Sequence, residues 1–175
     1  KKLITKTYEG IDLQPIYNDF DIEDLPFTSE KPGFLNYLRG SNASGYINNS
    51  WKLTQEIFTN DLTEFNKALI GDLDNGLNAI YIHSELKIEK SSDFKIIFRN
   101  IDITKFPIYF APQFSSISYL SLFVSYLKSV NINPADITGS LSVDPLYCLS
   151  VKGELPVALD YLYDEMAEVI KWTDS

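Results

Sequence analysis

The chain of 175 residues is acidic, with 15 Lys and Arg against 24 Asp and Glu and a formal net charge of −9. This charge repels phosphate backbones and argues against a nucleic-acid partner. A single cysteine and a single histidine exclude a disulfide framework, a multi-cysteine metal site and most histidine-based metal sites or catalytic triads. Because 45% of the residues are apolar, the chain can bury the core of one domain or of a large piece of one.

The sequence has no apolar run of the roughly 18–20 residues that span a bilayer. Its first residues also lack the apolar centre of a secretory signal. Together with the single cysteine, these features lead us to expect a cytoplasmic protein without membrane contacts. The chain starts without Met, so we expect a processed or shortened form of a longer protein.

The first 60 residues have no regular pattern of apolar side chains. Residues 19–24 are mostly acidic, and prolines and glycines separate short apolar groups. These prolines and glycines are Pro15, Pro26, Pro32, Gly33, Gly40 and Gly45. We therefore expect an extended arm over residues 1–60 and a folded unit over residues 61–175.

Helix signals begin at Asp61. Asp61 and Glu64 form a variant of the capping box, and we expect the helix that follows to stop at Gly71. Apolar residues at helical spacing predict three further helices. These begin at Ser92, at Ser115 or Ser116, and at Pro156, and the second of them ends at Asn131 and Pro134.

Short, mostly apolar runs between the helices predict parallel strands at 77–82, 107–111 and 138–143. Their starts are separated by 30 and 31 residues, which is the period of a β/α unit. The fold class is therefore α/β. A (β/α)8 barrel needs eight strands and about 250 residues, so this pattern leaves open both a small open sheet and the first part of a barrel.

Two motifs in the arm carry a resemblance to a known family. Residues 8–17 read Tyr-Glu-Gly-Ile-Asp-Leu-Gln-Pro-Ile-Tyr, and residues 32–40 read Pro-Gly-Phe-Leu-Asn-Tyr-Leu-Arg-Gly. Both resemble the N-terminal segment of methylmalonyl-CoA mutases, whose second motif is Pro-Gly-x-x-Pro-aromatic-x-Arg-Gly, and only Asn36 replaces a proline. The resemblance implies the N-terminal part of a (β/α)8 TIM barrel, preceded by an extended arm. It also implies a separate adenosylcobalamin domain with an Asp-x-His-x-x-Gly signature, which these 175 residues lack.

The resemblance fails at the residues that carry the chemistry. In catalytic members, threonines and arginines of the segment after the second motif hold CoA, and a tyrosine at its end contacts the acyl group. Here Thr54 stands at an arginine position, and Glu56 stands at the position of that catalytic tyrosine. Ser44 and Lys52 are altered positions of the same segment, and Lys152 corresponds to an arginine that binds the substrate carboxylate.

A sequence that keeps the arm motifs but has lost the site residues resembles the small, non-catalytic (β) subunit of heterodimeric mutases. We therefore expect an N-terminal fragment of such a subunit, with no catalytic residue, no metal and no cofactor of its own. The holoenzyme would contain adenosylcobalamin, and the partner would be the large catalytic subunit. The interface is expected in the arm, at Tyr8, Tyr17, Phe34, Tyr37 and Arg39.

Two other functions remain open, namely an active acyl-CoA mutase with an altered substrate and an unrelated acidic α/β binding domain. In the first, Lys52, Thr54 and Glu56 would contact a different ligand. For His83 and Cys148 we expect structural roles rather than roles as a ligand, base or nucleophile. Arg39 could serve a subunit contact or anchor the arm.

Overall fold

The computed structural model describes residues 3–48, 50–112 and 116–174. They form two compact units that divide after Trp51. This boundary lies earlier than residue 60, where we expected the arm to end. The reason is that residues after Trp51 already contact the α/β unit: Leu53 exchanges hydrogen bonds with Asn78, and Ile57 packs against the core. We refer to residues 52–60 as the connector.

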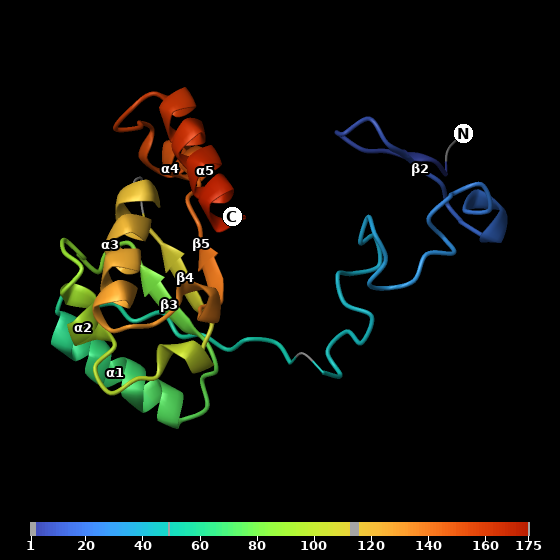
Figure 1. The fold of residues 1–175 in the computed structure, drawn as a ribbon. Coiled ribbons are helices and arrows are strands. Elements are labelled where there is room, and N and C mark those ends of the chain that lie inside the picture. Colours follow the sequence, from blue (N-terminus) through green and yellow to red (C-terminus); the bar gives the residue numbers. More distant parts are fainter. Residues whose placement is uncertain (1–2, 49, 113–115, 175) are drawn as a thin grey trace. The chain divides into compact units, whose positions relative to one another are not determined.

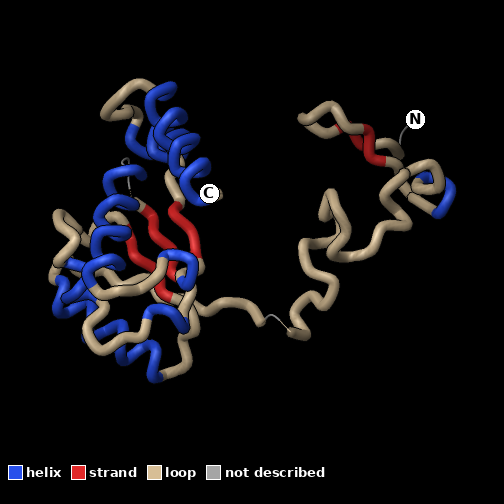
Figure 2. Tube along the Cα trace, in the orientation of Figure 1, coloured by secondary structure: helices blue, strands red, loops and turns tan. Residues whose placement is uncertain are grey.

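The first unit, the arm, contains little regular structure (Figure 2). Strand β1 (Thr5–Lys6) pairs antiparallel with β2 (Asp12–Leu13), and a short 3-10 helix, η1, covers Asp19–Asp21. Among the described residues of this unit, none is buried. Its fold therefore depends on local hydrogen bonds and not on an apolar core.

The second unit is built on three parallel strands, which confirms the predicted α/β class and the parallel pairing. The strands are β3 (Ile80–His83), β4 (Ile108–Ala111) and β5 (Gly139–Leu141), and they lie in that order. Ile80, Ile108 and Gly139 share one row of the register. At Gly139 the two strands approach so closely that a Cβ atom would overlap the carbonyl of Ile108, and the φ angle of +142° also favours glycine.

Helices and strands alternate along the second unit as expected up to β5, and two helices follow this strand (Figure 1). The α-helices are α1 (Leu62–Asp74), α2 (Asp93–Ile97), α3 (Ser116–Ser129), α4 (Pro145–Lys152) and α5 (Leu159–Thr173). Two 3-10 helices, η2 (Ile103–Lys105) and η3 (Pro134–Asp136), precede β4 and β5. Helices α1, α2 and α3 pack against the same face of the sheet, and α5 packs beside α3.

Several predicted helix boundaries were wrong. Helix α1 passes through Gly71 and ends at Asp74, because the additional turn places Leu73 against the core. Pro156 does not start α5, which begins after Ala158. Helix α4 was not predicted, although Asp144 caps it by accepting a hydrogen bond from the Tyr147 N–H. The alternative helix start at Ser115 lies outside the described residues.

The core lies between the sheet and α1 to α3 and is rich in aromatic rings. Phe94 of α2 lies at the centre of this cluster, with its ring centroid 5.2 Å from that of Phe123. Phe110 of β4 contacts the same Phe123 ring at 4.8 Å. Asn66 of α1 is buried here and donates to the carbonyl oxygens of Ile97 and Arg99, so it satisfies the end of the short helix α2.

The C-terminal part of the unit is only partly covered. In α5, Leu162 is buried, whereas the apolar side chains of Tyr161, Ile170 and Trp172 are exposed. Strand β5 pairs with β4 and with no other strand of the described part of the chain. Three strands are too few to close a barrel, so the unit has the architecture of a partial α/β domain.

Candidate functional site

The two faces of the sheet differ in chemistry. Ile80, Ile82, Ile108 and Phe110 alternate along β3 and β4 and are buried under the helices. The residues between them point to the other face because side chains alternate along a strand. On that face the register aligns Tyr81, Tyr109 and Ser140 in one row, and His83 and Ala111 follow at the carboxyl ends of β3 and β4.

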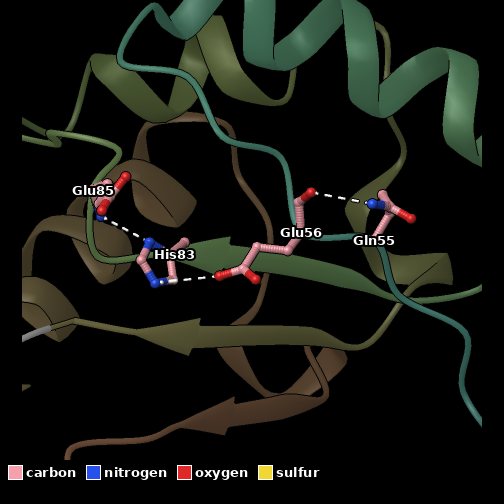
Figure 3. Close-up of polar contacts among 4 residues, drawn as sticks. All are labelled: Gln55, Glu56, His83 and Glu85. Carbon is pink, nitrogen blue, oxygen red and sulfur yellow. Dashed lines mark hydrogen bonds and ion pairs between the residues drawn. The ribbon is translucent and has the colours of Figure 1, made fainter.

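The connector runs along β3 in the same direction as the strand. Near its start, the Leu53 N–H donates to Oδ1 of Asn78 over 2.7 Å, and the Asn78 N–H donates to the Leu53 carbonyl oxygen. Further along, Oε1 of Glu56 lies 3.2 Å from Nε2 of His83 (Figure 3). The connector is therefore attached near both ends of β3. Its second attachment uses Glu56, which belongs to the predicted substrate site.

Both ring nitrogens of His83 are engaged. Its Nδ1 accepts a hydrogen bond from the backbone N–H of Glu85 over 3.2 Å, so Nδ1 carries no proton (Figure 3). The proton is then on Nε2, which donates to the Glu56 carboxylate. The His83 ring also lies near two aromatic rings, those of Phe58 and Tyr81, at centroid distances of 5.9 Å and 6.4 Å.

Two tyrosines that the sequence analysis did not select belong to this site. Burial, the Glu56 carboxylate and Tyr147 together raise the pKa of Tyr81, with burial as the largest cause. Glu56, Tyr81, His83 and Tyr147 thus come from the connector, from β3 and from the start of α4. The alternation of Tyr81 and His83 with buried isoleucines is the sequence signal that could have identified Tyr81.

The other altered positions that the resemblance predicts lie in different elements. Lys52 and Thr54 are exposed on the connector, and Lys152 is the exposed last residue of α4. Ser44 lies in the arm, where its hydroxyl donates to Oδ1 of Asn42 over 2.8 Å. Glu56 makes a polar contact with β3 through His83.

The predicted interface residues lie in the arm. Tyr8, Tyr17, Phe34 and Tyr37 are exposed. Arg39 instead bonds within the arm, because its Nη2 donates to the carbonyl oxygen of Thr28 over 2.9 Å. Of the two roles considered for Arg39, the structure therefore shows the anchoring contact.

Within the described ranges, no group of three or more His, Cys, Asp or Glu side chains could hold a metal ion. No helix in the same ranges has the length and apolar character needed to cross a membrane. Cys148 is buried in α4, as expected for a small apolar side chain.

Comparison with known proteins identifies the family. The sequence model of the family described as methylmalonyl-CoA mutase matches residues 6–88 and 83–175. The methylmalonyl-CoA mutase small subunit of Porphyromonas gingivalis is 28% identical over 155 residues, which cover 87% of this chain and 24% of that protein. The methylmalonyl-CoA mutase of Escherichia coli is 22% identical, with 82% of this chain and 23% of that protein covered.

The large subunit of methylmalonyl-CoA mutase from Streptomyces virginiae is also 22% identical, with 82% of this chain and 23% of that protein covered. The chain thus spans about a quarter of the length of the curated relatives that it matches. Because the two family matches together extend over nearly all of the sequence, the chain belongs to the methylmalonyl-CoA mutase family.

Proposed function

We propose that this chain is the N-terminal part of the small, non-catalytic subunit of a heterodimeric, adenosylcobalamin-dependent methylmalonyl-CoA mutase. The observation that carries the proposal is the contact between Glu56 and His83. Glu56 stands where catalytic family members have the tyrosine that contacts the acyl group. In this chain, the carboxylate of Glu56 is already in contact with His83, a side chain of the same protein.

The side chains at positions 54 and 56 of the connector support the proposal that this subunit is not catalytic. A carboxylate at position 56 repels the carboxylate of methylmalonyl-CoA, and its contact with His83 directs it toward β3. Thr54 offers one hydroxyl group where an arginine would offer a rigid fork of donors to a phosphate. The substitutions therefore remove both attraction for the substrate and the group that contacts the reacting atoms.

The residues of this chain do not fit a cobalamin site. A histidine that ligates cobalt needs a free ring nitrogen, and both nitrogens of His83, the single histidine of the sequence, have partners. In the proposed holoenzyme, we assign adenosylcobalamin and its radical chemistry to the partner subunit. This chain contributes a folded scaffold and an interface.

The sheet supports the proposal that the unit begins a (β/α)8 barrel. Its helix-covered face is apolar, and its other face carries Tyr81, His83, Tyr109 and Ser140. In a closed barrel, the first face would lie outside, under the ring of helices, and the second would line the interior. The three β/α units of this chain would then continue into the remaining strands of a longer subunit.

The exposed side chains of the arm support the proposal that the chain binds a partner subunit. It exposes many large apolar side chains, including Tyr8, Phe20, Phe34 and Leu35, and none of its described residues is buried. An apolar segment without a core gains stability when it is buried against another surface. We assign that surface to the large catalytic subunit and place the heterodimer in the cytoplasm.

Isothermal titration of the full-length small subunit with methylmalonyl-CoA tests the catalytic part of the proposal. We expect no turnover and no saturable binding at micromolar substrate, while the large subunit under the same conditions serves as the positive control. Saturable binding that a Lys52→Ala variant loses would instead show a working CoA site. That result would favour the active mutase with an altered substrate.

Hydrogen exchange tests whether the arm contacts the large subunit. Residues 8–40 should exchange rapidly in the free small subunit and become protected when the large subunit is added. The α1 to α3 core should remain protected in both states and serves as the internal control. Unchanged exchange across residues 8–40 in a complex that does form would exclude the arm as the interface.

A further inference from the structure

Helix α1 ends in a hydrogen-bonded turn, residues 71–77, which we call the Schellman turn. Asn75 caps the helix, and Gly76 follows with a φ angle of +107°. The Gly76 N–H donates to the Leu73 carbonyl oxygen over 3.2 Å. The Leu77 N–H donates to the Asp72 carbonyl oxygen over 3.1 Å. These two bonds define a Schellman motif, and glycine suits it because the position after the cap has positive φ.

Asn75 and Gly76 also form the one Asn-Gly pair of the sequence. This pair is prone to lose the side-chain amide, because glycine has no Cβ atom to shield its backbone nitrogen. That nitrogen gives up its proton and attacks Cγ of Asn75. An N–Cγ bond forms, the Cγ–Nδ2 bond breaks, and Nδ2 takes up a proton and leaves as ammonia. Water then opens the five-membered ring at either carbonyl, which gives aspartate or isoaspartate at position 75.

The folded chain holds both reacting groups away from this reaction. The Gly76 nitrogen is bonded to Leu73, and Nδ2 of Asn75 donates to the Gly71 carbonyl oxygen over 2.8 Å. Ring closure needs the Gly76 nitrogen to lie beside Cβ of Asn75 about the Cα–C bond. The observed ψ angle of 7° places it beside the backbone nitrogen of Asn75 instead. The reaction therefore requires the Schellman turn to open.

A carboxylate at position 75 fits this helix end poorly. The last turn of α1, residues 71–74, reads Gly-Asp-Leu-Asp, so two carboxylates already lie at the negative end of the helix dipole. Aspartate adds a third carboxylate and removes the Nδ2 donor. Isoaspartate also adds a methylene group to the backbone, which displaces the N–H groups of Gly76 and Leu77 from their acceptors. Either product weakens the turn that protected the asparagine.

We propose that Asn75 is a deamidation site which the Schellman turn holds unreactive, and that its conversion loosens the end of α1. The co-reactant is water, which reaches the site because Asn75 and Gly76 are exposed. Opening requires only that the end of α1 frays, and helix ends open at lower cost than the core. Because ammonia is lost, each opening that leads to reaction leaves a permanent change.

Ageing of the full-length subunit at mildly alkaline pH tests the protection, with mass spectrometry of the peptide that contains positions 75 and 76. We expect conversion at Asn75 to be at least about tenfold slower in the folded protein than in the urea-unfolded chain. Asn78 precedes alanine in the same peptide and is the internal control, with slow conversion expected in both states. Equal rates at Asn75 in the two states, or an unfolded chain that does not convert, would overturn the proposal.

Two leucines of α1 distinguish fraying of the helix end from unfolding of the whole unit. Leu62 and Leu73 are both partly buried against the core, at opposite ends of the helix. Leu73→Ala should speed conversion in the folded state about threefold or more relative to Leu62→Ala. Urea unfolding of both variants supplies the correction for differences in global stability. Equal corrected rates would mean that global unfolding controls the reaction and would overturn the role of the Schellman turn.

Asn75→Asp and Asn75→Ala test the effect of the product. Both variants lose the Nδ2 donor, and only Asn75→Asp adds a charge. We expect the amides of Gly76 and Leu77 to exchange with solvent at least about threefold faster in Asn75→Asp than in Asn75→Ala, and added salt should reduce the difference. Equal exchange in the two variants would overturn the proposed loosening.

Discussion

Oε1 of Glu56 lies 3.2 Å from Nε2 of His83, and this contact joins the connector to the last residue of β3. It also accounts for two predicted features at once. Glu56, for which the resemblance predicts the position of the catalytic tyrosine, and His83, the single histidine of the chain, are partners of each other. The same contact therefore removes one candidate substrate contact and one candidate ligand.

A double-mutant cycle should detect this contact. We expect a coupling free energy of about 0.5–1 kcal/mol between Glu56→Ala and His83→Ala, a modest value because both side chains are partly exposed to water. Chemical denaturation of the full-length subunit is the measurement. Glu85→Ala is the control, since Glu85 contacts His83 through its backbone N–H and should show no coupling to Glu56→Ala. Additive effects of the Glu56 and His83 changes would contradict the assigned contact.

Gly139 should be the least replaceable residue of β5. A Cβ atom there would overlap the Ile108 carbonyl, and alanine would also be strained at a φ angle of +142°. We expect Gly139→Ala to lower the free energy of unfolding by more than about 3 kcal/mol or to prevent folding. The neighbouring Ser140→Ala should cost less than about 1 kcal/mol, because it loses only an exposed contact with Ser142. Equal stability of the two variants would show that β5 does not approach β4 as described.

Tyrosine ionisation should make the fold sensitive to alkali. Burial raises the pKa of Tyr119 and Tyr126, and burial together with Glu56 and Tyr147 raises that of Tyr81. The unfolded chain loses these protons near pH 10, whereas the folded chain retains them to higher pH. The stability they contribute is therefore complete below about pH 10 and is lost as pH rises through the folded pKa values.

Unfolding in urea at a series of pH values between about 8 and 11 measures this loss. Tyr119→Phe should reduce the slope of stability against pH above about pH 10, because its phenol no longer ionises on unfolding. Tyr8→Phe is the control, since Tyr8 is fully exposed in the arm. A slope that Tyr119→Phe leaves unchanged would contradict the effect of burial on this group.

Local patterns predicted the elements that local forces determine. Phe123, Tyr126 and Leu127 recur at helical spacing, and they form the buried face of α3. The isoleucines of β3 and β4 likewise identified buried strands. The pattern failed at Gly71 because a glycine weakens a helix by only about 1 kcal/mol, and contacts of Leu73 with the core offset such a cost.

The sequence by itself determined the α/β class and the three strands, because each depends on composition or on spacing along the chain. The altered residues at positions 54 and 56 are predictions from the resemblance to the family. Only the tertiary structure decided that Glu56 meets His83, that Glu56 and Tyr147 both act on Tyr81, and that Arg39 bonds to the Thr28 carbonyl. These contacts join segments that are separated in sequence and come together when the connector packs along β3 or when residues 28–39 of the arm fold back on themselves. No periodicity along the chain records such a pairing, because it depends on where the backbone turns in space.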